Sequence, residues 1–515
     1  MAKIRVYPSR RGTTPTTTPL SILDATVARF SPTGAIWLFD SPEITDSELL
    51  DNLRSSLETT LNDFPYWAGQ LHWAPVRKGG SHTERFNRPA VTYDTDSDLG
   101  VEWGIVRHET LSVKSLAPSA DERALGSGIW IGDAFDQKPF LSDTLLPLHN
   151  LKDYEGLPAV QVQINLFSDG YGLGIKMSHS LADAQALMVF VHRWAANSRN
   201  TFALGGTVED VSSFAGPPVF DPVLLDSHAA GDIDGPVADP KLAEEARQLP
   251  IHRFNWWGVN DPGYSPFLIP TTANSKPSAE ILQSSQISPS IPAPWTTWDF
   301  SRHVSYTLLH FSGPKIAQLK REAATEGGSE ISRLDALLAY IWTKINQARG
   351  HSQSSEDVYL NFTLGARPRV SPPLPESFIG SPLFLTHIRK SGLDASTSSI
   401  GHTARQIRST MQLFTPEKMG AILHDAAFEV SPQRLWQAFL GTQHTIVTSW
   451  LRLNLYEVDF VGKGQKARYV HAVMPKMDGC LQVMDTGVED GGIDLALYLD
   501  KDATERLLLD KTLGT

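Results

Sequence analysis

KMSHSLADAQAL (residues 176–187) places His179 directly after a run of apolar residues and four positions before Asp183. Upstream, QVQINLF (161–167) alternates polar and apolar side chains, as a strand with one apolar face does. SDGYG (168–172) supplies turn residues, so we predict a hairpin whose second strand ends next to the histidine. After the aspartate, apolar residues recur at helical spacing. The sequence therefore predicts a strand, a turn and a helix that together aim the imidazole inward, toward a cavity.

The composition indicates a globular protein with more than one domain. The chain has 515 residues, of which 41% are hydrophobic and 20% charged, and single cores seldom grow beyond about 250 to 300 residues. A formal net charge of −12 without a long basic run argues against nucleic acid or anionic membranes as partners. Cys480 is the single cysteine, which excludes an internal disulfide and favours a reducing, cytoplasmic location. No segment has the length of a membrane span or of a signal-peptide core.

The composition changes strongly in residues 205–300, which hold 13 of the 34 prolines together with several tryptophans. Proline removes backbone donors, so this range cannot form a continuous helix or a central strand. We predict a long crossover here that joins two α/β domains, 1–204 and 301–515. Its tryptophans, among them Trp256 and Trp257, should let it pack on a surface, because aromatic side chains carry a large apolar area.

His179 alone does not establish a catalytic site, since a histidine on an apolar face is more often a hydrogen-bonded core residue. Catalytic zinc needs three protein ligands, and neither HExxH nor paired cysteines occur, so we predict no metal site. The GxSxG, Walker and GxGxxG motifs are also absent, and GYGLG (170–174) is explained more simply as a hairpin turn. If His179 does act, a neutral imidazole with a pKa of about 6.5 suits a general base.

Several segments, in the right order along nearly the whole chain, resemble the BAHD acyltransferases, coenzyme A-dependent enzymes that share an HxxxD motif. SHSLAD supplies that motif with His179 and Asp183. LSILD (20–24) is similar to the family's opening strand, and LRSSLETTLNDFPYWAGQL (53–71) to its first helix with an AGRL-like turn. ISRLDALLAYIW (331–342) is similar to its CoA-proximal helix, and ARPRVSPPLPESFIG (366–380) to its R-x-R and PPLP segment. VTSWLRLNLYEVDF (447–460) is similar to the approach to its DFGWG motif, and DGGIDLALYLDKDATERLL (490–508) to its closing strand and helix.

Three positions depart from the family's motifs. DFVGK (459–463) stands for DFGWG and lacks the tryptophan, Ala184 replaces the glycine that usually follows the HxxxD aspartate, and Gln70 replaces the arginine of AGRL. The DFGWG tract, here with Asp459, is structural in the family, so we expect catalysis to survive. The length and the long crossover are similar to those of fungal secondary-metabolism members.

The resemblance implies two chloramphenicol-acetyltransferase-like domains, each a mixed β-sheet flanked by helices, and an acyltransferase activity of class EC 2.3.1. His179 would deprotonate a hydroxyl or an amine, which attacks the thioester of an acyl-CoA, acetyl-CoA by default, in one ternary complex. No cofactor would be permanently bound. The hydroxyl of Thr448 and the indole N–H of Trp450 would stabilise the oxyanion.

The resemblance also implies supporting and CoA-binding residues. Asp183 would turn away from the histidine and pair with Arg367 or Arg369. Ser332, Arg333 and Arg369 are the candidates that would meet the CoA phosphates. On the opposite side, the acceptor would be a large apolar metabolite with a hydroxyl or an amine, and crossover aromatics such as Trp256, Trp257 and Phe267 would contribute to its pocket.

Two alternatives remain open. Peptide-synthetase condensation domains share the two-lobed architecture, but they carry a doubled histidine where this chain has Ser178, and no carrier domain is attached. A non-catalytic binding protein on the same fold is the other alternative, although the intact His179, Asp183, Thr448 and Trp450 count against it. Because both domains of the site belong to one chain, we expect a monomer.

Overall fold

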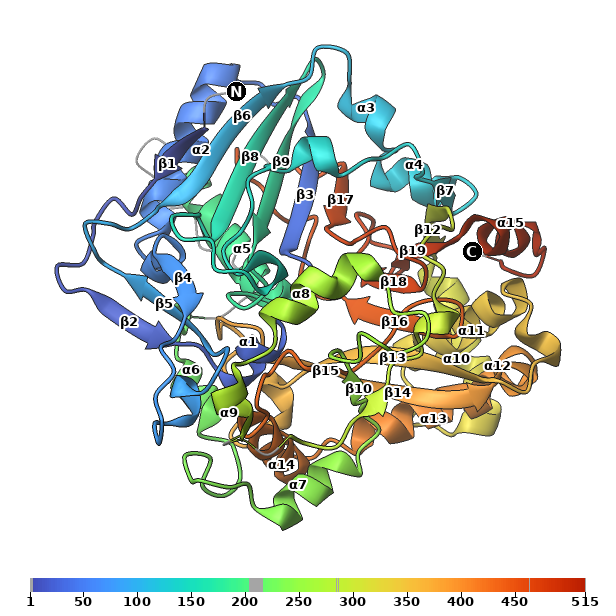
Figure 1. The fold of residues 1–515 in the computed structure, drawn as a ribbon. Helices are drawn as coiled ribbons and strands as arrows, with labels where there is room; N and C mark the ends of the chain where they lie inside the picture. Colours follow the sequence, from blue (N-terminus) through green and yellow to red (C-terminus); the bar gives the residue numbers. More distant parts are fainter. Residues whose placement is uncertain (1–2, 203–215, 284, 286, 463, 515) are drawn as a thin grey trace.

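The computed structural model describes residues 3–202, 216–283, 285, 287–462 and 464–514. Two large mixed sheets lie side by side and form the centre of the structure (Figure 1). The first sheet contains, in spatial order, β1 (Lys3–Val6), β6 (Val101–Arg107), β8 (Val160–Phe167), β9 (Gly170–Met177), β3 (Thr33–Asp40) and β17 (Tyr469–Ala472). The second contains β14 (Leu383–Ser391), β13 (Asp357–Gly365), β16 (His444–Ser449), β18 (Cys480–Met484), β19 (Ile493–Asp500), β12 (Val304–Phe311) and β7 (Ile129–Ile131).

Helices flank both sheets and bury their apolar faces in two separate cores. The main helices on the first sheet are α2 (Asp46–Thr60) and α5 (Ala184–Phe202), and those on the second are α10 (Gly313–Gly327), α11 (Arg333–Ala348), α12 (Gly392–Thr397), α13 (Ile400–Gln412) and α15 (Lys501–Leu509). Beside the sheets lie α3 (Val113–Leu116), α4 (Ala120–Leu125), α14 (Pro416–Ala427) and a small sheet of β2 (Thr16–Pro19), β5 (Pro89–Tyr93) and β4 (Gln70–Trp73). None of the helices in the described ranges is both long and apolar enough to cross a membrane.

The predicted hairpin is confirmed. Strands β8 and β9 pair antiparallel, with Phe167 opposite Gly170. Both faces of β8 are buried, because the polar face is covered as well: the amide of Gln163 donates to the carbonyl of Pro139 (2.8 Å) and that of Asn165 to the carbonyl of Phe140 (3.0 Å). The alternation in QVQINLF therefore separates an apolar core face from a hydrogen-bonded buried face.

Each large sheet takes one strand from the other half of the chain. β17 pairs antiparallel with β3, and β7 pairs antiparallel with β12. The predicted ranges 1–204 and 301–515 supply the remaining strands of the first and second sheets. The predicted boundary at residue 204 lies outside the described residues. The exchange ties the two halves together through backbone hydrogen bonds.

The segment LSILD, which we expected to form a strand, forms the short helix α1 (Ile22–Thr26) instead. Ser21 and Asp24 make a capping box: the serine hydroxyl accepts the backbone N–H of Asp24 (3.2 Å), and the carboxylate accepts that of Ser21 (2.9 Å). These bonds satisfy the first donors of a helix, so the preceding strand β2 ends at Pro19.

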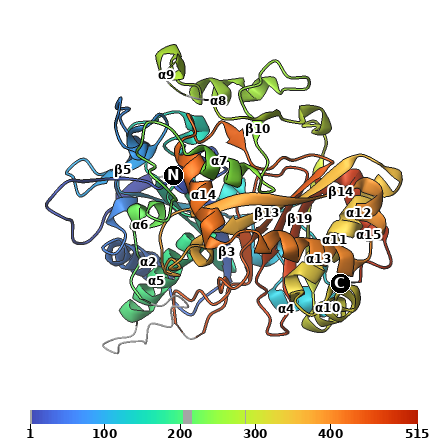
Figure 2. The same ribbon diagram turned by 90° about the horizontal axis from the view of Figure 1, so that it is seen from below.

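The crossover packs on the molecule through its aromatic side chains, as predicted. Its elements are α6 (Pro222–Asp226), α7 (Pro240–Arg247), β10 (Phe254–Asn255), α8 (Ile269–Asn274), α9 (Ala279–Gln283) and β11 (Ile291–Pro292). Trp256, Trp295 and Trp298 are buried around Phe439 and Trp436, and the centroid of the Trp295 ring lies 5.1 Å from that of Phe439. Figure 2 shows α8 and α9 along one edge of the molecule.

A cluster of aromatic rings docks the crossover on the second sheet. His252, just before β10, stacks on His387 of β14 with ring centroids 3.7 Å apart, and His444 of β16 stacks on Tyr359 of β13. Burial, reinforced by the neighbouring imidazoles, lowers the pKa of His252 to about 2. Burial likewise lowers the pKa of His387 to about 4 and that of His444 to about 3. All three imidazoles are therefore neutral in the folded protein near neutral pH.

This cluster predicts a loss of stability in acid. Above about pH 6.5 these histidines are neutral in both the folded and the unfolded chain. Below that pH the unfolded chain protonates them, whereas the folded chain does so only at about pH 4 and below. Stability should therefore fall as the pH is lowered from about 6.5, by up to about 1.4 kcal/mol per pH unit for each group. Thermal unfolding of the wild type and of His387→Phe, followed between about pH 8 and pH 5, measures the effect. The variant should show a shallower dependence, and equal slopes would contradict the prediction.

Candidate active site

His179 lies in the turn between β9 and α5, at the boundary of the two sheets. The turn is closed by a hydrogen bond from the backbone N–H of Leu181 to the carbonyl of Ser178 (3.0 Å). The imidazole is partly exposed, and the edge of its ring meets that of Phe30, with centroids 5.5 Å apart. Burial lowers the pKa of His179 below its usual value, while the hydrogen bond to its own backbone carbonyl and the carboxylate of Asp183 partly offset that effect. At neutral pH the ring is neutral and able to accept a proton.

Asp183 caps helix α5 and does not hydrogen-bond to His179. Its Oδ1 accepts the backbone N–H of Ala186 (2.9 Å), the third residue of the helix. The same carboxylate receives two hydrogen bonds from Arg367, at 2.6 Å and 3.0 Å. Both side chains are buried. Of the two arginines considered from the sequence, Arg367 makes the ion pair, which joins the first half of the chain to the second.

Arg367 also holds the loop that approaches the histidine. It belongs to the short helix η8 (Arg367–Arg369) and donates a further hydrogen bond to the carbonyl of Phe378 (2.8 Å). The backbone N–H of Asp183 donates to the carbonyl of Gly380 (3.0 Å). The loop ending at Gly380 is therefore bound both to the ion pair and to the start of α5.

Ser381 touches the imidazole directly, although no motif in the sequence points to this residue. Its Oγ lies 3.2 Å from Nδ1 of His179, and its hydroxyl donates to the backbone carbonyl of the same histidine. The backbone N–H of Ser381 donates to Asp24 of α1 (2.6 Å). Burial raises the pKa of Asp24 to about 7, against the lowering effect of hydrogen bonds from Ser21 and Ser381.

Thr448 and Trp450 lie at the end of β16. Thr448 is partly exposed and stands opposite Gln482 of β18. Trp450 follows the strand, donates its backbone N–H to the carbonyl of Val483 (2.7 Å), and is buried. Within the described part of the chain, no hydrogen bond or ring contact joins either residue to His179.

Ser332, Arg333 and Arg369 do not form one contiguous site by direct contact. Ser332 caps α11 by accepting the backbone N–H of Asp335 (3.1 Å), and the exposed Arg333 donates to the carbonyl of Gly491. Arg369 donates to the carbonyl of Gly365 (2.8 Å).

A second arginine connects Arg369 to this helix. Arg408 of α13 donates to the carboxylate of Asp335 (2.8 Å), next to the N-terminus of α11. Burial, together with the positive charge of Arg408, lowers the pKa of Arg369. Arg408, which sequence analysis missed, thus binds the start of α11 and lies near enough to Arg369 to affect its pKa.

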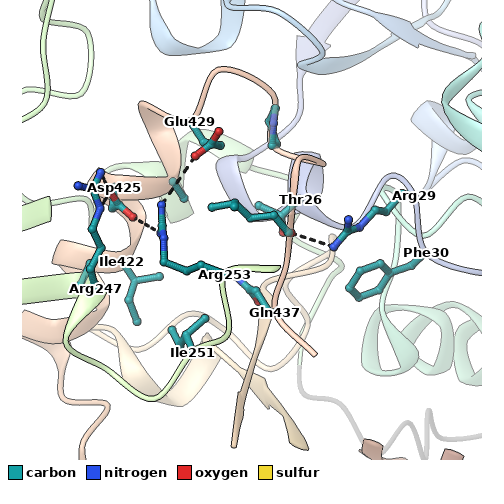
Figure 3. Close-up of a pocket in the computed structure, with 14 residues that line it drawn as sticks. Thr26, Arg29, Phe30, Arg247, Ile251, Arg253, Ile422, Asp425, Glu429 and Gln437 are labelled. Carbon is teal, nitrogen blue, oxygen red and sulfur yellow. Dashed lines mark hydrogen bonds and ion pairs between the residues drawn. The ribbon is translucent and has the colours of Figure 1, made fainter. Parts of the chain in front are cut away.

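A pocket that is partly open to solvent adjoins the histidine through Phe30 (Figure 3). Figure 3 shows Asp425 between Arg247 and Arg253 on one side, and Arg29 and Phe30 on the other. The remaining lining residues are Thr26, Ala246, Ile251, Ile422, Ala426, Glu429, Pro432, Leu435 and Gln437.

Arg29 forms the polar wall of this pocket nearest to Phe30. It donates to the backbone carbonyls of Gln433 and Leu435, each at 2.8 Å. Its guanidinium lies 5.2 Å from the ring of Trp256 and 5.3 Å from that of Trp436. Burial lowers the pKa of Arg29 to about 9. The aromatic crossover thus holds one wall of the pocket in place.

The crossover aromatics suggested from the sequence are not themselves among the residues that line this pocket. Trp256 flanks it through Arg29, whereas the indole N–H of Trp257 donates to Ser275, the residue that follows α8 (2.8 Å). Phe267 is 58% exposed and contacts Phe300. Trp256 is buried in the packing of the crossover, whereas Trp257 is only partly buried. Among the described residues, no group of three or more His, Cys, Asp or Glu could hold a metal ion.

The model of the Transferase family matches residues 133–227 and 272–508, which together are more than half of the chain. The chain belongs to this family, the BAHD acyltransferases. It is 28% identical to acyltransferase AFT15-1 of Alternaria alternata, over 99% of this chain and 96% of the relative. It is 27% identical to acyltransferase abl6 of Leptosphaeria maculans, over 87% of this chain and 83% of the relative. The predicted acyltransferase class is thereby confirmed.

Solved BAHD structures confirm the predicted two-domain mixed α/β fold. TRI101 of F. graminearum, complexed with ethyl coenzyme A, matches with a TM-score of 0.67 at 14% identity, over 97% of this chain and 98% of that one. Vinorine synthase matches with a TM-score of 0.61 at 17% identity, over 98% of this chain and 95% of that one.

Asp459 organises the loop that stands where the BAHD family has DFGWG. Its Oδ1 accepts the backbone N–H groups of Val461 and Gly462, and its Oδ2 accepts those of Gly464 and Gln465, at 2.8 to 3.1 Å. Lys463 lies outside the described residues. A carboxylate that accepts four backbone donors shapes the loop without any contribution from an indole.

The double attachment of Asp183 predicts that its loss destabilises the fold. Asp183→Ala removes the cap of α5 and leaves the buried guanidinium of Arg367 unpaired, so the free energy of unfolding should fall by about 3 to 5 kcal/mol. Asp183→Asn, which keeps an acceptor for Ala186, should lose less. Denaturant unfolding measures both. The exposed Asp51→Ala is the matched control and should change stability by less than about 0.5 kcal/mol. A natively stable but inactive Asp183→Ala would instead indicate a direct role in the chemistry.

Proposed function

We propose that this BAHD enzyme transfers an acyl group, acetyl in the first instance, from acyl-CoA to a hydroxyl of a hydrophobic small molecule, with His179 as general base. The observation that carries the proposal is the histidine itself. It stands in the turn where the two halves of the chain meet, next to a pocket, with its pKa lowered by burial. A neutral, partly exposed imidazole in such a place can accept a proton from a bound hydroxyl.

In this mechanism, His179 takes the proton of the acceptor hydroxyl while its oxygen attacks the thioester carbon. The hydroxyl of Thr448 and the indole N–H of Trp450 stabilise the resulting oxyanion. When the C–S bond breaks, the thiolate of CoA leaves and takes the proton back from the imidazolium. The acyl ester and free CoA are the products, and no acyl-enzyme forms.

The acyl-CoA would bind with its phosphates near the start of α11. Helix N-termini favour anions, and Ser332 and Arg333 lie at this one. Arg369 and Arg408 add positive charge beside Asp335 of the same helix. We infer that these groups, and not a metal ion, hold the phosphates.

The pocket of Figure 3 would hold part of the acceptor, because Phe30 belongs to both the pocket and the surroundings of His179. TRI101 of F. graminearum has been solved with coenzyme A and deoxynivalenol, and with coenzyme A and T-2 mycotoxin. The pocket's polar groups point to an acceptor that offers more than the reacting hydroxyl for hydrogen bonding. We also propose that the enzyme works as a cytoplasmic monomer.

Thiol release tests the proposed transfer. The purified protein and His179→Ala are incubated with a panel of acyl-CoAs, first without an acceptor, and thiol release and acyl-CoA binding are followed together. Slow release that depends on His179 would identify the acyl group, with water replacing the acceptor. With an acceptor, turnover of His179→Ala should be about 100- to 10,000-fold lower.

His303→Ala, at an exposed histidine, is the control for this experiment and should turn over normally. Near-normal turnover of His179→Ala would contradict the general-base role. Tight acyl-CoA binding with no transfer to any acceptor would favour a non-catalytic binding protein on the same fold. Neither binding nor release by the folded protein would contradict the proposed use of acyl-CoA altogether.

The pH dependence of kcat/KM gives a second test. Protonated His179 cannot accept the hydroxyl proton, so activity should fall on the acid side of its pKa. Because burial lowers that pKa, the inflection should lie below pH 6.5, the ordinary value. Steady-state rates at limiting acyl-CoA, measured over the pH range in which the fold is stable, locate the inflection. An inflection clearly above pH 6.5 would show that another group controls the acid limb.

A further inference from the structure

The hydroxyl of Ser381 has a single proton, and the positions of its two neighbours determine which of them receives that proton. The hydroxyl donates to the backbone carbonyl of His179, a group that can only accept. The same oxygen lies 3.2 Å from Nδ1 of His179 and has no second proton to offer. Toward the imidazole, Ser381 can therefore only accept, and Nδ1 must carry the proton. The lone pair of the neutral ring is then on Nε2.

We propose that Ser381 is a positioning residue that holds His179 in the tautomer with Nδ1 protonated and Nε2 free to act as the base. The inference rests on the proposed role of His179. A tautomer is set by the hydrogen bond at the other ring nitrogen.

The position of Ser381 is fixed from both halves of the chain. Its backbone N–H donates to the buried carboxylate of Asp24 at 2.6 Å. The preceding Gly380 accepts the backbone N–H of Asp183. Gly380 has φ +144°, and a Cβ there would lie 3.1 Å from Oδ1 of Asp24, so only glycine lets the loop pass this close. The serine hydroxyl is held in place by the backbone on which it sits.

The opposite side of the imidazole is restrained as well. Phe30 meets the His179 ring edge to face, with an interplanar angle of 86°. A flip of the ring by 180° would leave its plane against Phe30 unchanged but would break the contact of Nδ1 with Ser381. The two contacts together define one orientation of the ring, and Ser381 selects which nitrogen is protonated in it.

Ser381→Ala removes the acceptor, and Ser381→Thr keeps it. With His-specific ¹⁵N labelling, the chemical shifts of the ring nitrogens identify the tautomer, and the signals of His179 are assigned by their loss in His179→Gln. In the wild type, Nε2 should be unprotonated. In Ser381→Ala, a form with Nε2 protonated should appear, and kcat should fall about tenfold, equivalent to about 1.4 kcal/mol. The KM for acyl-CoA should change by less than about twofold. Ser381→Thr should restore both the tautomer and most of kcat.

Ser377→Ala is the matched control, because Ser377 is a buried serine four positions earlier in the same loop, bound to Val219 through its backbone carbonyl. It should leave the spectrum of His179 and kcat unchanged. If Ser381→Ala does not fold, Ser381→Cys, whose sulfur is a weak acceptor, replaces it. A Ser381→Ala spectrum identical to that of the wild type overturns the proposal, whether or not kcat falls.

The spectroscopic measurement needs no substrate, so the two proposals can fail separately. A tautomer shift in Ser381→Ala, combined with full activity of His179→Gln, would support the positioning by Ser381 and remove the base role of His179. An unchanged tautomer, combined with loss of activity in His179→Gln, would keep the base and overturn the positioning.

Discussion

The ion pair between Asp183 and Arg367 is the interaction on which the rest of the site depends. It is buried and bidentate, and it joins the start of α5 to η8. A buried pair is costly to desolvate, and its attraction compensates only when the remaining hydrogen-bonding groups are satisfied. Most of them are engaged: the carboxylate also caps α5, and the guanidinium also binds the carbonyl of Phe378, whereas the buried Nε of Arg367 has no hydrogen-bond partner among the described residues. The pair is therefore best understood as a device that fixes the relative position of two loops.

This role explains the spacing of the HxxxD motif. Asp183 must be the residue directly before α5 in order to cap it, and that helix follows β9 after a short turn. His179, four residues earlier, then falls within the turn, beyond the last strand residue. The aspartate positions the histidine through the backbone between them and through Gly380, which it binds by its own N–H. No hydrogen bond between the two side chains is required.

Local patterns in the sequence predict the elements around the site and fail where long-range pairing decides. The hairpin and the start of α5 follow from periodicity and turn residues, since each depends on neighbouring residues only. LSILD was misassigned as a strand because the assignment followed the family resemblance and not the capping box, S-x-x-D, that the sequence does contain. Ser381, Asp24 and the exchange of β7 and β17 are different. They bring together residues far apart in the chain, and a single sequence carries no information about such contacts.

The same distinction applies to the missing tryptophan of the DFGWG segment. From the sequence, its absence left open whether the loop keeps its shape. The structure shows that Asp459 alone receives four backbone donors of this loop, while Ser198 and Arg199 of α5 bind the carbonyls of Phe460 and Asp459. The hydrogen bonds of Asp459 and the contacts with α5 therefore hold this loop in shape without a tryptophan side chain. Since Asp183 caps α5, the anchor of this loop and the position of the histidine both depend on one helix, and a change that shifts α5 would disturb both.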